Sequence, residues 1–215
     1  MPGRTSHHRF TTRADGDLAV GAVGVAGRRS ALVDLPWTWL DQVHGADVVT
    51  VTRPGEHAGA AADAAVTAVP GAVVAVQAAD CAPVVLLAEG AVGVVHAGWR
   101  GLVAGVLPAA VGAMRALGAD RVQGLLGPCI HAGCYEFGEA DLAEVATGLG
   151  AAVVGRTASG APGMDVPAAV RACLAGVDVS LDTSSSTCTA CRPDALWSHR
   201  ARADSGRQAA LAWLT

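Results

Sequence analysis

An apolar stretch from Val69 to Val95 limits what this chain can fold into more than any other feature of its sequence. It resembles a membrane-spanning segment in length, but Gln77, Asp80 and Glu89 interrupt it, and Gly and Pro residues punctuate it. Short apolar runs bounded by turn residues are typical of buried strands, whereas a spanning helix needs about 20 predominantly apolar residues in a row. The stretch therefore predicts buried strands joined by turns.

Three strands are expected within this stretch, at 72–77, 84–88 and 91–95. Glu89 and Gly90 separate the last two, which predicts a tight antiparallel hairpin. Outside the stretch, the alternating β-branched run at 47–52 predicts a further strand.

Helical periodicity appears only after this strand-rich part. It predicts helices at 102–117, 139–149 and 166–175, with Gly118 as a stop signal after the first. A strand is expected at 122–126, and 207–214 reads as a strand or a short helix. Because strands and helices do not alternate regularly, the pattern favours an α/β fold with a mixed sheet and hairpins over a repeating βαβ array.

Composition excludes several classes of function. Hydrophobic residues make up 52% of the 215 residues and charged residues 16%, so the chain can bury a sizeable core, and no low-complexity linker divides it. The net charge of −4 gives no electrostatic footprint for nucleic acid or an anionic membrane. The first 13 residues lack the apolar segment of a secretory signal. We therefore expect a cytoplasmic protein whose six cysteines are reduced.

Two histidines and one cysteine stand where apolar runs meet Gly or Pro: His44 in QVHG, Cys81 in ADCAP and His96 in VHAGWRG. Loops at strand ends are where α/β proteins place their chemistry. Imidazole and thiolate are both good zinc ligands, and three protein ligands leave a fourth position open. The spacing is long and irregular, so a solvated histidine and a core cysteine remain the simpler interpretation of each residue alone.

Two neighbours of this set could take part in the chemistry. Asp80 could orient a group near the metal or act as a general base, or it could cap a loop amide. Arg100 could bind an anionic group of a substrate, or it could form an ordinary ion pair. The other cysteines, including the Cys188-x-x-Cys191 pair, Cys129, Cys134 and Cys173, favour a structural role.

Taken together, the segments QVHGADVV, AADCAPVVLL and GVVHAGWRGL resemble the bacterial laccase-domain proteins, also called multicopper polyphenol oxidases, peptidoglycan editing factors or purine nucleoside phosphorylases. FTTR near the start, GPCI followed by YE, and SHR followed by SGR near the end extend the likeness over nearly the whole chain.

This resemblance implies a single domain, 1–215, with stacked mixed β-sheets flanked by helices. It implies a zinc ion, with copper as the alternative, bound by His44, Cys81 and His96, and catalysis that also involves Asp80. Arg29 and Arg100 are the expected substrate-binding residues. The implied activities are phosphorolysis of adenosine, inosine and methylthioadenosine, and deamination of adenosine. The implied partners are therefore a purine nucleoside and phosphate, and the expected state is a monomer or small homo-oligomer.

The sequence departs from the family pattern near the substrate end. A segment that usually carries Asn is shortened here and reads Ala19 at that position, and the usual acidic residue near the end of SHRAR is missing. Three alternatives stay open: a copper-dependent phenol oxidase, a Cys–His hydrolase with Cys81 as nucleophile, and a catalytically weakened binding protein.

Overall fold

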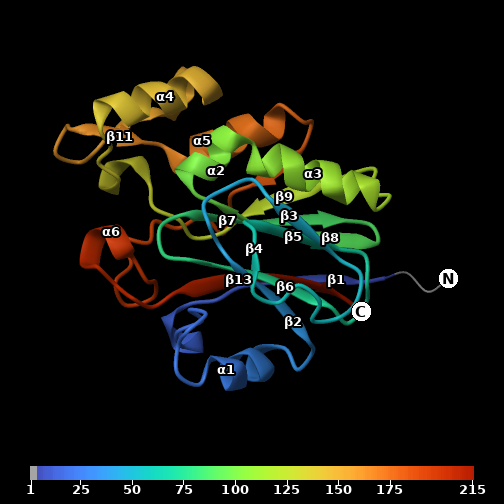
Figure 1. Ribbon diagram of the computed structural model, residues 1–215. Helices are drawn as coiled ribbons and strands as arrows, with labels where there is room; N and C mark the ends of the chain where they lie inside the picture. The colour runs from blue at the N-terminus through green and yellow to red at the C-terminus, as the bar shows by residue number, and fades with distance from the viewer. Residues whose placement is uncertain (1–3) are drawn as a thin grey trace.

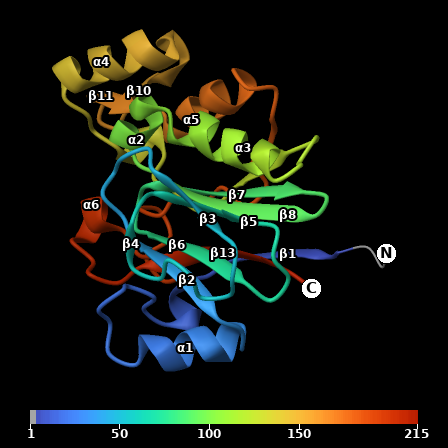
Figure 2. The same cartoon turned by 45° about the vertical axis from the view of Figure 1, so that its right-hand side comes forward.

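The computed structural model describes residues 4–215, and its two main sheets stack face to face between layers of helices (Figure 1). Helices from the middle of the chain cover the outer face of one sheet, and a helix near the N-terminus lies against the outer face of the other (Figures 1 and 2). This arrangement confirms the expected fold class. The helices are α1 (Val25–Leu32), α2 (Trp99–Ala104), α3 (Val106–Ala116), α4 (Glu139–Leu149), α5 (Val166–Ala175) and α6 (His199–Arg202).

The larger sheet has six strands in the order β12-β9-β7-β8-β5-β3 and mixes parallel with antiparallel pairs. The predicted hairpin joins its two central strands, with Ala88 opposite Ala91 and Pro83 opposite His96. Its strands are β3 (Val48–Val51), β5 (Ala64–Thr67), β7 (Ala82–Ala88), β8 (Ala91–Ala97), β9 (Gln123–Leu126) and β12 (Ser180–Asp182).

The second sheet has five strands in the order β1-β13-β6-β2-β4. Its last strand in the sequence, β13, settles the ambiguous segment 207–214 as a strand. The strands are β1 (Ser6–Phe10), β2 (Trp37–Asp41), β4 (Ala60–Ala61), β6 (Val73–Ala78) and β13 (Gln208–Leu214), and a separate two-stranded ribbon is made by β10 (Val154–Arg156) and β11 (Pro162–Met164).

Apolar side chains fill the interfaces of this layered structure, and two of these interfaces involve the larger sheet. Leu40, Val85 and Ala210 are among the buried residues of a cluster drawn from both sheets. A larger cluster joins the six-stranded sheet to its helices and includes Leu107 and Leu174. Strands of the larger sheet are therefore covered on both faces, which explains why they read as continuous apolar runs in the sequence.

The predicted helix 102–117 is wrong in one respect, because the structure divides it into α2 and α3. Gly105 lies between them with φ 86°, ending the first helix and starting the second. A left-handed backbone is open to glycine at no steric cost, so this residue can break a segment whose apolar periodicity looks continuous. In contrast, α4 and α5 have the predicted bounds. Within residues 4–215, no helix combines the length and hydropathy needed to cross a membrane.

Candidate metal centre

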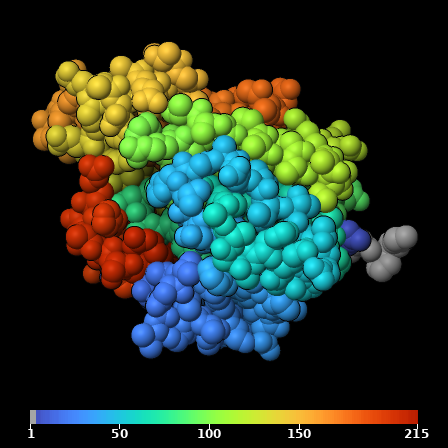
Figure 3. Space-filling model, in the orientation of Figure 1, coloured from blue at the N-terminus to red at the C-terminus, as the bar shows by residue number. Residues whose placement is uncertain are grey.

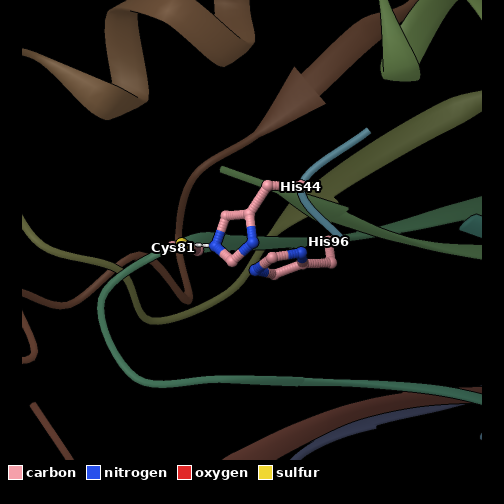
Figure 4. Close-up of side chains that lie close together, drawn as sticks. All are labelled: His44, Cys81 and His96. Atoms are coloured by element: carbon pink, nitrogen blue, oxygen red, sulfur yellow. Dashed lines mark hydrogen bonds between the residues drawn. The ribbon is translucent and has the colours of Figure 1, made fainter. Parts of the chain in front are cut away.

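The fold brings together the three candidate ligands from distant parts of the sequence. His44 lies in the loop between β2 and β3, Cys81 directly precedes β7, and His96 lies near the end of β8. Their ligand atoms all lie within 4.8 Å of one another. The His44 Nε2 is 3.9 Å from the Cys81 Sγ, and the two imidazole centroids are 4.8 Å apart with nearly perpendicular rings. Figure 4 shows the three side chains converging.

The backbone has unusual conformations at His44 and directly before Cys81. His44 has φ 61° and Asp80, directly before Cys81, has φ 102°, both in the region that L-residues rarely adopt. Such conformations persist only where the surrounding structure holds them, and they cluster at functional sites. Gly98 completes the packing, because a Cβ there would lie 2.8 Å from the His44 Cδ2 and 3.4 Å from the Cys81 Sγ.

A fully buried carboxylate, Asp63, holds two of the ligands in place. Its Oδ1 lies 2.8 Å from the His96 Nδ1 and also accepts a hydrogen bond from the His44 backbone N–H. Its Oδ2 accepts from the N–H groups of Val43 and Gly45. Sequence reasoning missed Asp63 as a site residue, since a carboxylate between two alanines gave no sign of its partners. A buried aspartate next to an apolar strand is itself the signal that could have pointed to it.

Neighbouring groups shift the pKa values of Cys81 and His96. Burial opposes ionisation of Cys81, but the His96 and His44 imidazoles outweigh it and lower the pKa of this thiol to about 6. Burial likewise opposes protonation of His96, yet Cys81 and Asp63 raise the pKa of its imidazole to about 9. In the metal-free protein the pair is therefore a thiolate beside an imidazolium at neutral pH.

The donor set fits a zinc ion. With Zn–N bonds of about 2.0–2.1 Å and Zn–S bonds of about 2.3 Å, tetrahedral coordination separates the N and S atoms by roughly 3.6 Å. The observed distance of 3.9 Å between the His44 Nε2 and the Cys81 Sγ is close to that value. The Asp63 carboxylate engages the Nδ1 of His96, which leaves its Nε2 free for a metal.

A cavity of about 530 Å³ opens beside the candidate ligands. This volume is within the usual range for a small-molecule site. His44, Cys81 and His96 line one side, and apolar residues including Leu40, Ala78 and Ala19 line another part. The C-terminal segment, red in Figure 3, lies on the same face of the molecule as the blue N-terminal segments.

Asp80 also lines the cavity, and its carboxylate is fully engaged with the C-terminal segment. Its Oδ1 accepts hydrogen bonds from the hydroxyls of Thr189 (2.6 Å) and Ser198 (2.7 Å), and its Oδ2 accepts from the backbone N–H of Arg200 (2.6 Å). Of the roles that the sequence left open for Asp80, this geometry favours an anchoring one, because three donors already occupy the carboxylate.

The structure does not bring Arg29 or Arg100 to the cavity lining. Arg29 is buried in α1 against the Trp39 ring, where its Nε and Nη2 atoms have no hydrogen-bond partner among the described residues, and burial lowers its pKa. Arg100 is exposed and its guanidinium lies 4.3 Å from the centroid of Trp99. Helix α2 begins at Trp99, and Arg100 is its second residue.

Two other arginines, Arg200 and Arg207, line the cavity instead. The Arg200 guanidinium lies 5.0 Å from the centroid of Tyr135, another lining residue, while the Nη1 of Arg207 donates to three nearby backbone carbonyls. Sequence reasoning missed these residues because they belong to the last quarter of the chain, and long-range contacts, among them the Asp80 hydrogen bonds, bring that segment to the site.

A family model described as multi-copper polyphenol oxidoreductase laccase matches residues 22–215. Among curated relatives, a purine nucleoside phosphorylase of Streptomyces coelicolor is 41% identical over 206 residues, which cover 94% of this chain and 81% of the relative. A purine nucleoside phosphorylase of Streptomyces griseus is 42% identical over 207 residues, covering 93% and 83%.

Solved structures share the fold over almost the full length. A Neisseria meningitidis protein of a family described as DUF152 superposes with a TM-score of 0.86 at 29% identity, covering 97% of this chain and 94% of the other. The Bacillus licheniformis protein YfiH, described as hypothetical, superposes with a TM-score of 0.84 at 22% identity, covering 98% and 93%. The second likeness concerns the fold alone.

Proposed function

The chain belongs to the multi-copper polyphenol oxidoreductase laccase family, and from that membership we propose that it is a zinc-dependent enzyme that cleaves purine nucleosides with phosphate. The observation that carries the proposal is the position of the His44, Cys81 and His96 cluster on the wall of a cavity with two lining arginines. The name purine nucleoside phosphorylase, borne by relatives at 41–42% identity, supports the reaction class.

In this proposal His44, Cys81 and His96 hold the metal. When bound, zinc supplies a Lewis acid at the position that three protein ligands leave open. The chain's own residues do the positioning: Asp63 fixes the tautomer and orientation of His96 through its Nδ1 and holds the His44 loop through three backbone N–H groups. This support keeps the ligands in place before any substrate arrives.

Phosphate is assigned to Arg200, with Arg207 as a second positive charge on the same cavity. A guanidinium recognises phosphate oxygens through paired N–H donors. The backbone N–H of Arg200 donates to Asp80, which fixes the backbone at this residue. The Arg200 side chain is exposed, and its guanidinium lies beside Tyr135. Placement therefore favours Arg200 over Arg29 and Arg100, the two arginines expected from the sequence.

The purine and ribose would occupy the space between these charges and the candidate ligands. In phosphorolysis, a phosphate oxygen forms a bond to the ribose C1′ while the bond from C1′ to the purine N9 breaks. The electron pair of that bond leaves with the purine, which takes up a proton. Ala19 and Val20 line the same cavity, so the place where the family usually carries Asn bears directly on substrate choice. We therefore propose adenosine, inosine and methylthioadenosine as a panel, with adenosine deamination as a second reaction.

The proposal is tested by incubating the zinc-loaded protein with each nucleoside, with and without phosphate, and separating the products by chromatography. Phosphate-dependent release of the free base with ribose 1-phosphate is expected, and inosine formed from adenosine without phosphate reports deamination. Cys81→Ala should abolish turnover and metal binding. Cys173→Ala is a matched control, since Cys173 is a buried cysteine of α5 outside the cavity lining. Absence of any product from zinc-loaded protein would overturn the proposal.

A Cys–His hydrolase is the second candidate, because Cys81, His96 and Asp63 also have the order of a nucleophile, a base and an orienting carboxylate. The two candidates differ in their response to metal. Turnover by metal-free protein that an alkylating agent abolishes would favour the thiol, whereas turnover restored by zinc favours the metal. The copper alternative, a phenol oxidase, predicts an intense blue absorbance on copper loading.

A further inference from the structure

A second group of metal-ligating side chains lies apart from the three candidate ligands. Cys134, Cys188 and Cys191 place their sulfur atoms within 4.8 Å of one another, although the first is 54 residues before the second (188 − 134). The sequence alone favoured a structural role for each of them, because one C-x-x-C pair without a second is a weak signal. The fold supplies the missing third thiol from the 3₁₀ turn at Ala132–Cys134.

The sulfur spacing suits a metal ion. Zn–S bonds of about 2.3 Å in tetrahedral geometry place sulfur atoms roughly 3.8 Å apart. The Cys134 and Cys191 sulfurs are 3.4 Å apart, and all three cysteines are free thiols. A disulfide would require a separation of about 2.05 Å. The three thiols therefore lie at the spacing of ligands that share one ion.

The backbone around Cys188 forms a turn that other groups hold in place. A hydrogen bond of 3.2 Å from the Cys191 N–H to the Cys188 carbonyl closes the C-x-x-C segment into a turn. Arg202 donates to the carbonyls of Thr189 and Ala190, which holds the same turn from outside.

Exposure within the group fits a site that an ion can enter. Cys188 is buried, with 8% of its surface exposed, whereas Cys134 is half-buried and Cys191 is exposed. Because Cys191 lies at the surface, a fourth ligand position can face solvent. Soft thiolate ligands select zinc over hard cations such as Mg²⁺ and Ca²⁺.

We propose that Cys134, Cys188 and Cys191 bind a second zinc ion, separate from the one assigned to His44, Cys81 and His96. Its role is structural: the ion ties the turn before Tyr135 to the segment whose Thr189 hydroxyl donates to Asp80. Tyr135 and Asp80 both line the cavity, so this second site braces part of the cavity lining. The proposal goes beyond the proposed function and does not depend on any turnover.

The test counts metal in protein purified under reducing conditions, loaded with zinc and desalted. Native mass spectrometry and elemental analysis are compared for wild type, Cys191→Ser, Cys81→Ala and the double variant. Cys191→Ser should hold one equivalent less than wild type, and the double variant should lose what remains. Because Cys191 is exposed, its replacement removes little packing, and circular dichroism checks the fold. Cys173→Ala, which changes a buried cysteine outside both groups, should keep the full metal content.

Cobalt gives an independent readout. In Cys81→Ala, Co²⁺ should produce sulfur-to-cobalt charge-transfer bands and the visible bands of a tetrahedral ion, and adding Cys191→Ser should remove them. The proposal is overturned if Cys191→Ser holds as much metal as wild type, or if Cys81→Ala holds none. An intact mass lower by two hydrogens, with a Cys134–Cys191 bond in the peptide map, would also overturn it in favour of a redox pair.

Discussion

Gly98→Ala tests whether close packing at Gly98 sets the position of His44. The backbone of Gly98, at φ −71° and ψ 160°, suits alanine, so the added methyl group is the only change. That Cβ would lie 2.8 Å from the His44 Cδ2. Carbon atoms in contact lie about 3.5–4.0 Å apart, so the ring must retreat by about 0.7–1.2 Å. Metal–ligand distances in zinc sites are expected within about 0.2 Å of their usual values.

We expect Gly98→Ala to lower metal affinity by roughly 10–100-fold, the range seen when groups that orient metal ligands are removed. Competition against a chromogenic chelator measures this change. The free energy of unfolding of the metal-free protein should fall by about 1–3 kcal/mol, as for other overpacked sites. Nucleoside cleavage should fall in parallel with metal occupancy.

Gly112→Ala is the matched control. Gly112 lies in α3 with no atom within 4 Å of its would-be Cβ, so alanine there should stabilise the helix by about 0.5–1 kcal/mol and leave metal affinity unchanged. If Gly98→Ala binds zinc as tightly as wild type, then contact with Gly98 does not fix His44, and the reasoning from this packing is refuted.

Three further predictions concern the same site. Asp63→Asn should lower the free energy of unfolding, measured in urea, by about 1–3 kcal/mol and should weaken zinc binding. The reason is that the amide N–H₂ would face backbone N–H groups that now donate to the carboxylate. Unchanged values in both assays would argue against Asp63 as a positioning residue. In metal-free protein, alkylation of Cys81, followed by peptide mapping, should stay fast at pH 7 and slow only as the pH falls through about 6. The reason is that the pKa of the Cys81 thiol is lowered from 9.0 to about 6, and the reactive thiolate is lost below that pH. A midpoint near pH 9 would contradict this prediction. Arg200→Ala should raise the KM for phosphate by roughly 10-fold or more, because a hydrogen bond to a charged group contributes about 1.5–3 kcal/mol. Arg100→Ala should leave this KM unchanged, because Arg100 stacks on an aromatic ring outside the cavity. Equal effects of the two changes would refute the assignment of phosphate to Arg200.

The three residues that the sequence singled out as candidate ligands lie together in the structure, and each stands at a chain position with a local signature. A polar residue at the junction of an apolar run with Gly or Pro marks a strand end, and His44, Cys81 and His96 all have that form. Their meeting could not be read from spacing, because it depends on strand pairing. In the β7–β8 ladder Pro83 lies opposite His96, which brings Cys81 next to that histidine.

Groups that act through long-range contacts were beyond sequence reasoning. Asp63 is held among apolar residues, and its four hydrogen-bond partners come from residues 18 to 33 positions away. The backbone N–H of Arg200 donates to the Asp80 carboxylate, 120 positions earlier, and this long-range contact helps to place Arg200 beside the cavity. The break at Gly105 was hidden for a different reason, because the apolar periodicity continues across it and only the backbone conformation changes.

Two buried carboxylates organise separate sets of hydrogen bonds near the cavity. Asp63 binds only the His44 loop and His96, whereas Asp80 binds only residues of the C-terminal segment. Since neither carboxylate contacts the partners of the other, a change in one group of contacts need not disturb the second. Ala19, in the N-terminal segment that departs from the family pattern, lines the cavity, but its backbone N–H donates to the Asp17 carboxylate and not to Asp63 or Asp80. The departure at Ala19 is therefore expected to alter which nucleoside binds without changing how the metal is held.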